Sequence, residues 1–202
     1  MNNVHITVVF DRSGSMSARK TDAEGGLAAF LEAQETADTT CSLYEFDNEF
    51  QAVYENVPLA DVPPYVLVPR GGTALLDAVG RALAATKEAV KGTEKKVVVA
   101  VVTDGHENSS TTYTLPGIRK KIEKRREKGW EVIFLGCEED AIDVAAAMGI
   151  PRSRSVYVDP SNLKGGMLHA GEMVMRGTVS GVYAYTETER TASGLAPEPE
   201  TP

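Results

Sequence analysis

A carboxylate and two hydroxyls are closely spaced near the start of the sequence, in the order Asp11-x-Ser13-x-Ser15. They follow the apolar run 4–10, at the point where a buried strand would end. Ligands of open α/β sheets bind at the carboxyl ends of the strands, so a loop at this place can present all three side chains to one ligand. Carboxylate and hydroxyl oxygens are hard donors that suit Mg²⁺ or Mn²⁺ and not Zn²⁺. Serine-rich turns after strands also cap helices, so the motif alone leaves a simple capping loop as an alternative.

Two further connections offer oxygen donors that could reach the same place. Thr73 follows a pair of glycines and stands immediately before a helical pattern, and Asp104 follows the most apolar strand-like run, 96–103. Because the carboxyl ends of parallel strands meet at one edge of a sheet, we expect these side chains to lie near the first motif. The predicted ligands of a Mg²⁺ or Mn²⁺ ion are Asp11, Ser13, Ser15, Thr73 and Asp104.

The elements that must position these residues follow from the hydrophobic pattern. Residues 4–10, 96–103 and 130–136 form near-continuous apolar runs, which indicate strands covered on both faces of a parallel sheet. Apolar residues with helical spacing occupy the segments between them. Two shorter runs, 41–46 and 50–54, flank a turn-forming stretch and predict a hairpin with an antiparallel edge strand. The later segments predict a short helix over 141–148, a last strand over 155–158 and a closing helix, interrupted by glycines, over about 163–183.

This alternation of strands and helices predicts a three-layer, Rossmann-like α/β fold. Its open sheet is mostly parallel with one antiparallel edge strand, and helices cover both faces. The length of 202 residues and the 42% hydrophobic content fit one globular domain. From Glu187 onward the chain is rich in Thr, Ser, Pro and Glu, which cannot bury enough apolar surface to offset the cost of ordering. We therefore predict a domain over 1–186 and a disordered tail over 187–202.

The net charge and the cysteines further narrow the possible functions. The 21 Lys and Arg residues against 29 Asp and Glu residues give a net charge of -8, which disfavours nucleic acid and anionic membranes as partners. No apolar run is long enough for a membrane helix and no signal peptide is recognisable, so we expect a cytoplasmic protein. Cys41 and Cys137 lie in apolar surroundings without C-x-x-C spacing, which indicates buried thiols. The basic run 119–128 is interpreted as the solvated face of a helix, because Ile118 and Ile122 mark its other side as core.

Taken together, the three ordered motifs resemble the von Willebrand factor A domains, which carry a metal-ion-dependent adhesion site (MIDAS). The resemblance covers about residues 4–183, and every liganding position of the motif is filled. It implies that the two serines and Thr73 contact the cation directly or nearly so, and that the two aspartates act mainly through bound waters. It also implies that the open position of the cation takes a carboxylate from a partner protein. The sequence is most similar to an uncharacterised branch of the family in bacteria and bacteriophages.

Neighbouring residues are expected to support the site. Asp77 follows Thr73 by four residues, so on a helix it lies one turn further along the same face. The family motif contains an aspartate at this place, and we predict that Asp77 holds the site by a second-shell hydrogen bond. The rest of the predicted supporting set and rim consists of Gly72, Gly105, His106, Glu107 and Asn108.

These observations predict a metal-dependent protein-binding module and not an enzyme. Two alternatives stay open, a structural or virion-associated protein and a Mg²⁺-dependent phosphotransferase. Haloacid-dehalogenase-type phosphatases place a similar acid at a strand end, but they need D-x-D-x-T, and Ser13 occupies the position of the second acid. The sequence contains no P-loop, no dinucleotide-binding glycine motif and no nucleophile elbow.

Overall fold

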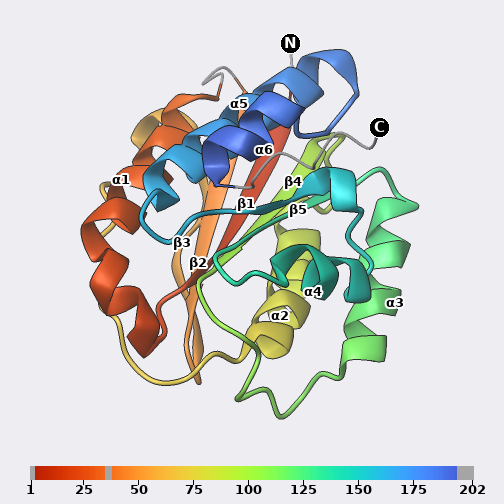
Figure 1. The fold of residues 1–202 in the computed structure, drawn as a ribbon. Helices are drawn as coiled ribbons and strands as arrows, with labels where there is room; N and C mark the ends of the chain where they lie inside the picture. Colours follow the sequence, from red (N-terminus) through yellow and green to blue (C-terminus); the bar gives the residue numbers. More distant parts are fainter. Residues whose placement is uncertain (1–2, 35–37, 195–202) are drawn as a thin grey trace, which may run out of the picture.

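An open β-sheet forms the centre of the molecule (Figure 1). The computed structural model describes residues 3–34 and 38–194, and within them six strands pair in the order β3-β2-β1-β4-β5-β6. Neighbouring strands are parallel except β2 and β3, which are antiparallel. The strands are β1 Val4–Asp11, β2 Thr39–Phe46, β3 Phe50–Pro58, β4 Lys96–Thr103, β5 Glu131–Gly136 and β6 Ser155–Tyr157. The predicted fold class is confirmed.

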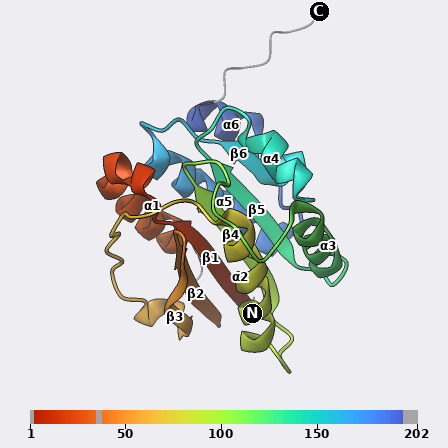
Figure 2. The same cartoon turned by 90° about the horizontal axis from the view of Figure 1, so that it is seen from below.

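Helices cover both faces of this sheet (Figure 2). α1 and α5 pack on one face, whereas α2, α3 and α4 pack on the other. The helices are α1 Lys20–Glu32, α2 Leu75–Ala89, α3 Leu115–Arg126, α4 Ala141–Ala147, α5 Leu163–Ser180 and α6 Glu187–Ser193. In the part of the chain that the structure describes, no helix combines the length and the apolar character needed to cross a membrane.

The central strands are buried on both sides. All eight residues of β1 are buried. Successive side chains of a strand point to opposite faces, so Val8 and Phe10 join the core under α1 and α5, and Val9 joins the core under α2 and α3. In the same way Val102 and Val101 of β4 belong to different cores. This double burial is the reason for the continuous apolar runs in the sequence.

The predicted hairpin is present, but its second strand is longer than expected. β3 extends to Pro58, beyond the expected end at Tyr54. The pairing shifts register between Cys41 and Tyr44, and Asn56 adopts a left-handed backbone with φ of 51°. These irregularities disturb the alternation of buried and exposed residues, so the pattern in the sequence does not show where the strand ends.

α5 runs through its glycines without a break. One of them, Gly171, lies where α5 crosses α1: a Cβ on Gly171 would come within 2.8 Å of the carbonyl oxygen of Phe30. Glycine therefore allows the two helices to approach closely, and the glycine-rich pattern of this segment reflects packing and not interruption.

The boundary predicted at residue 186 is wrong, because Glu187–Ser193 form the helix α6. Thr186 and Glu189 form a capping box at its start, and the Glu189 carboxylate accepts hydrogen bonds from Arg176 of α5 at 2.7 and 3.0 Å. Ser193 is fully buried at the end of the helix. The Thr-x-x-Glu spacing was a helix-start signal that the tail-like composition masked. Residues 195–202 of the predicted tail lie outside the described residues.

We expect the Glu189→Ala variant to lose about 2 kcal/mol of unfolding free energy, because it removes half of the capping box and leaves the Arg176 guanidinium without its carboxylate. Urea denaturation measures the change. Thr188→Ala, at an exposed position in the same helical turn, is the matched control and should change stability by less than about 0.5 kcal/mol. Equal stabilities of the two variants would show that α6 contributes little to the domain.

Candidate metal centre

Three connections of the chain meet at the carboxyl edge of the sheet. The first leaves β1 after Asp11, the second leads into α2, and the third leaves β4 after Thr103. Backbone hydrogen bonds join them: Gly14 N donates to the Gly71 oxygen at 3.1 Å, and Asn108 N donates to the Thr73 oxygen at 3.0 Å. The three predicted motifs, which are far apart in the sequence, are therefore brought together.

Asp11 is fully buried at the centre of this edge. One carboxylate oxygen accepts the Ser13 N–H at 2.6 Å and the other accepts the Thr103 hydroxyl at 2.6 Å. Burial raises the pKa of Asp11 to about 6, although these hydrogen bonds lower it. No Lys, Arg or His side chain of the described residues lies within ion-pair distance of it, since the neighbouring Arg12 turns to Glu45 and Asp47. A buried carboxylate without a counter-charge suits a cation.

The predicted hydroxyls face one small space next to Asp11. Ser13 Oγ and Ser15 Oγ are 3.0 Å apart, and Ser15 Oγ donates to Asp104 Oδ1 at 2.6 Å. A Cβ on Gly105 would lie 3.4 Å from Thr73 Oγ1 and 3.7 Å from Ser15 Oγ, so both hydroxyls border the space beside this glycine. Hydroxyls from two of the three connections therefore border the same space beside Gly105.

The donor set fits a small hard cation. Mg²⁺ binds oxygen at about 2.1 Å in an octahedral shell, which places adjacent ligands about 3 Å apart, as the two serine hydroxyls are. In the described residues no group of three or more His, Cys, Asp and Glu side chains is arranged to hold a metal, so this site depends on its hydroxyls. With only two carboxylates, Asp11 and Asp104, a bound divalent ion would keep much of its positive charge.

Access to the site is from the side of Ser15. Asp11, Ser13, Thr73 and Asp104 are each at most 3% exposed, whereas Ser15 is an exposed residue.

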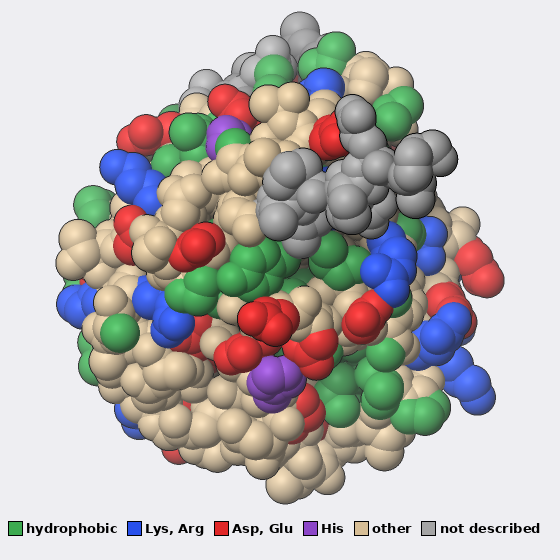
Figure 3. Space-filling view, in the orientation of Figure 1, with side chains coloured by type: hydrophobic (Ala, Val, Ile, Leu, Met, Phe, Trp, Pro, Cys, Tyr) green, Lys and Arg blue, Asp and Glu red, His purple; other side chains and the backbone are tan. Residues whose placement is uncertain are grey.

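Acidic side chains gather on the face of the molecule shown in Figure 3, as the net charge of -8 suggests. At the rim, His106 lies 2.9 Å from Asp140 in an exposed pair.

Asp77 lies behind the site and contacts the third connection. Its carboxylate accepts the backbone N–H groups of Thr111, Thr112 and Tyr113 at 3.1, 3.0 and 2.8 Å. Although burial alone would raise the pKa of Asp77, these three hydrogen bonds lower it below its usual value. Asp77 therefore fixes the loop that follows Asp104, instead of holding Thr73 directly. Its contact with the third connection is made to the backbone of that loop.

Two asparagines hold the connection that carries Thr73. Gly72 N donates to Asn48 Oδ1 at 2.7 Å, and Thr73 N donates to Asn108 Oδ1 at 2.9 Å. A Cβ on Gly72 would come within 2.9 Å of Asn108 Oδ1, so glycine permits this close approach. Asn108 was predicted at the rim, but the sequence analysis missed Asn48, because a turn asparagine between two strands carries no signal for such a contact.

The Glu107 carboxylate accepts backbone hydrogen bonds from two segments at the rim. One of its oxygens accepts the Leu76 N–H at 2.9 Å in the first turn of α2, and the other accepts the N–H groups of Ser109 and Ser110 at 2.9 and 2.7 Å. A carboxylate at a helix N-terminus satisfies backbone donors that have no partner within the helix. Glu107 thus ties the helix that follows Thr73 to the loop that follows Asp104.

Arg19 is a further residue at the site that the sequence analysis missed. It ends the 3-10 turn Gly14–Arg19, and its Nη1 lies 2.5 Å from Asp104 Oδ2. This contact joins residues 85 positions apart in the sequence. The spacing that could have indicated it is the position of Arg19 four residues after Ser15 in the same short segment.

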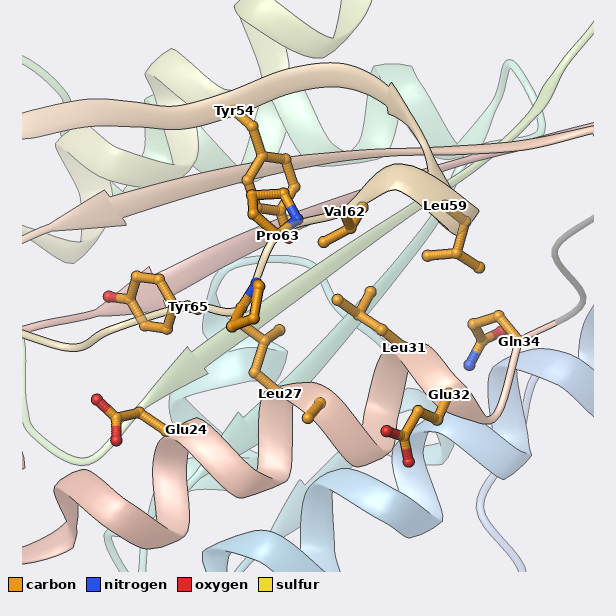
Figure 4. Close-up of a pocket in the computed structure, with 12 residues that line it drawn as sticks. Glu24, Leu27, Leu31, Glu32, Gln34, Tyr54, Leu59, Val62, Pro63 and Tyr65 are labelled. Atoms are coloured by element: carbon orange, nitrogen blue, oxygen red, sulfur yellow. The ribbon is translucent and has the colours of Figure 1, made fainter.

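One cavity beside α1 is separate from this centre. A cavity of about 370 Å³ lies between α1 and the segment 59–65, where Leu27 and Leu31 point toward Val62 and Tyr54 (Figure 4). It contains none of the predicted ligands. Glu24, which lines the cavity, accepts the Leu67 N–H at 2.8 Å. The cavity thus lies where the segment 59–65, which leads toward Thr73, crosses α1.

The two cysteines and the basic helix match their interpretation. Cys41 and Cys137 are buried free thiols, and burial raises the pKa of each to about 12. Ile118 and Ile122 of α3 are fully buried, as the amphipathic pattern predicts.

The fold is that of solved von Willebrand factor A structures. No protein-family profile matches the sequence, and no curated protein matches it. Proximal thread matrix protein 1 from the mussel byssus, solved with a zinc-occupied MIDAS motif, gives a TM-score of 0.65 at 16% identity over 86% of this chain and 46% of that one. A von Willebrand factor type A protein from Catenulispora acidiphila gives 0.63 at 14% identity over 86% and 43%. The manganese-loaded TRAP protein of Plasmodium vivax gives 0.60 at 13% identity over 85% and 74%.

The chain therefore has the von Willebrand factor A fold. It spans less than half of the mussel and Catenulispora chains, at 46% and 43%.

Proposed function

We propose that the chain is a divalent-metal-dependent protein-binding module that captures an Asp or Glu carboxylate of a partner protein. The observation that carries the proposal is the convergence of three hydroxyls and two carboxylates from three connections at one edge of the sheet. Mg²⁺ or Mn²⁺ would be held by Ser13, Ser15 and Thr73, with Asp11 and Asp104 beside it. A bound ion supplies a positive centre that attracts an external anion.

The residues of the site suit capture more than turnover. The Asp11 carboxylate is oriented by Ser13 and Thr103, so that both of its oxygens already accept hydrogen bonds. A phosphotransferase would need a carboxylate free to attack and a neighbouring acid, and Ser13 stands where that acid is required. The exposed side at Ser15 leaves a path for a side chain of another protein.

The structural neighbours support the metal in this proposal. One of them was solved with zinc in its MIDAS motif and another was solved loaded with manganese. The hard-oxygen donor set of this chain favours Mg²⁺ or Mn²⁺ over Zn²⁺.

Thermal denaturation tests the metal site. At 100 times its dissociation constant a ligand of the native state stabilises by about 2.7 kcal/mol, which raises the Tm of a domain of this size by roughly 5–10 °C. We expect this rise with Mg²⁺ or Mn²⁺, a smaller one with Ca²⁺, and none in Ser13→Ala or Thr73→Ala. Ser17→Ala, exposed in the same 3-10 turn, should respond like wild type. An equal response of Ser13→Ala and wild type would refute the site.

A second experiment tests capture of a protein partner. A partner recovered in Mg²⁺ should be released by EDTA and should bind neither Ser13→Ala nor Thr73→Ala, because each variant removes one hydroxyl ligand and neither residue belongs to a hydrophobic core. Amidation of the partner's carboxylates should abolish binding. Mg²⁺-dependent turnover of an aryl phosphate that Asp11→Asn loses would support the phosphotransferase instead.

A further inference from the structure

Arg19 places a fixed positive charge on one of the candidate metal ligands. Its Nη1 lies 2.5 Å from Asp104 Oδ2, while the other oxygen of the same carboxylate accepts the Ser15 hydroxyl at 2.6 Å. The Asp104 side chain is fully buried and that of Arg19 is 22% exposed. Arg19 Nε is buried and has no hydrogen-bond partner among the described residues, so the guanidinium is held at the site mainly by Asp104.

A guanidinium in this position competes with a metal ion for the same negative charge. An ion held by Ser15 and Asp104 would share the Asp104 carboxylate with Arg19, so the two positive charges would be close together and would repel each other. The same guanidinium neutralises Asp104 when no metal is bound. Asp11 differs, because no basic side chain of the described residues pairs with it.

We infer that Arg19 is the internal counter-cation of the metal centre and sets its affinity for divalent ions. It stabilises the metal-free site by pairing with Asp104 and weakens metal binding by its charge. The inference rests on the metal site proposed above. It predicts that removing the charge of Arg19 destabilises the metal-free protein and strengthens metal binding.

The test compares Arg19→Met, which keeps much of the side-chain length, with Arg19→Lys, which keeps the charge. Lys20→Met is the matched control: it removes one positive charge at the adjacent position, where Lys20 pairs with Glu24 and not with Asp104. Mn²⁺ binding is measured by isothermal titration calorimetry and by electron paramagnetic resonance of the free ion. The Tm is measured in EDTA and in saturating Mn²⁺.

We expect Arg19→Met to bind Mn²⁺ at least tenfold more tightly than wild type, to melt at a lower temperature in EDTA, and to show a larger rise in Tm with Mn²⁺. Arg19→Lys should remain within a few-fold of wild type, as should Lys20→Met. If wild type binds Mn²⁺ and Arg19→Met binds it equally or more weakly, the inference about Arg19 is overturned while the metal site stands. Arg19 would then be a residue that orients Asp104. Absence of Mn²⁺ binding in wild type and in every variant would overturn both the metal site and this inference.

Discussion

Replacing Arg12 with Met is expected to lower the free energy of unfolding by about 3–5 kcal/mol, the usual cost of breaking a buried ion pair from one side. Arg12 is only 5% exposed. Its guanidinium donates from Nε to Asp47 Oδ2 at 3.0 Å and from Nη1 to Glu45. The substitution leaves both buried carboxylates without their shared cation. Because native domains are stable by about 5–15 kcal/mol, the loss would be a large part of the total.

The partners of Arg12 explain why this position matters for the metal centre as well as for stability. Asp47 also accepts Nε of Arg70 at 2.6 Å, and Glu45 accepts the Tyr65 hydroxyl at 2.8 Å. The ion network thus joins the residue after Asp11 to the hairpin turn and to the segment that leads to Thr73. Arg70 N additionally donates to the Arg12 oxygen at 2.8 Å.

Urea denaturation of Arg12→Met against wild type measures this effect. Arg119→Met is the matched control, since Arg119 pairs with Glu123 at 2.9 Å on the exposed side of α3 and such pairs contribute at most about 1 kcal/mol. Adding Glu45→Gln to Arg12→Met should recover part of the loss, because the double variant leaves one fewer buried charge unpaired. A loss below about 1 kcal/mol in Arg12→Met would mean that the network is stable without its central cation.

The parts of the structure that the sequence predicts are those that depend on periodicity and on strand ends. The run 96–103 is apolar because both faces of β4 are covered, and Asp104 follows it because the strand ends there. The order of the motifs therefore places Asp11, Thr73 and Asp104 at one edge before any side-chain contact is known. Burial of Cys41 follows from its apolar neighbours in the same way.

What the sequence does not predict depends on contacts between distant segments. The pairing of Arg19 with Asp104 and the bond from Gly72 to Asn48 require the folded loops, and neither residue type is unusual at its position. Asp77 was expected beside Thr73 from helical spacing, but its carboxylate takes three N–H groups from a loop more than thirty residues later. The polar composition of α6 led to the prediction of a disordered tail. A polar seven-residue helix can nevertheless be stabilised by a capping box and one ion pair without a wide apolar face.

The second large effect is expected from His5, which should make the protein lose stability as the pH falls from about 6.5 to 4. His5 is fully buried in β1, with its ring nitrogens 2.9 Å from Thr40 Oγ1 and 3.3 Å from Ser42 Oγ. Burial, together with the positive charge of Lys95, lowers the pKa of His5 to about 4 from 6.5. The folded protein therefore resists taking up a proton that the unfolded chain accepts readily.

The sign of the effect follows from where the proton binds. Well above pH 6.5 neither state protonates His5, so the residue contributes no pH dependence. Between the two pKa values the unfolded chain binds the proton and the folded protein does not, so folding becomes less favourable. With pKa values of 6.5 and about 4, the loss is about 2 kcal/mol at pH 5 and about 3 kcal/mol at pH 4.

Asp11 acts in the opposite direction in the metal-free protein, so the two contributions must be separated. Burial raises the pKa of Asp11 to about 6 from 3.8, which favours the folded state at low pH and is lost as the pH rises through 6. Comparing wild type with His5→Asn at each pH cancels this contribution, because both proteins keep Asp11 and the two residues occupy opposite ends of β1. The free energy of unfolding, measured in urea between pH 7.5 and 4.5, should fall more steeply for wild type. Parallel curves for the two proteins would show that His5 is protonated as easily in the folded protein as in the unfolded chain.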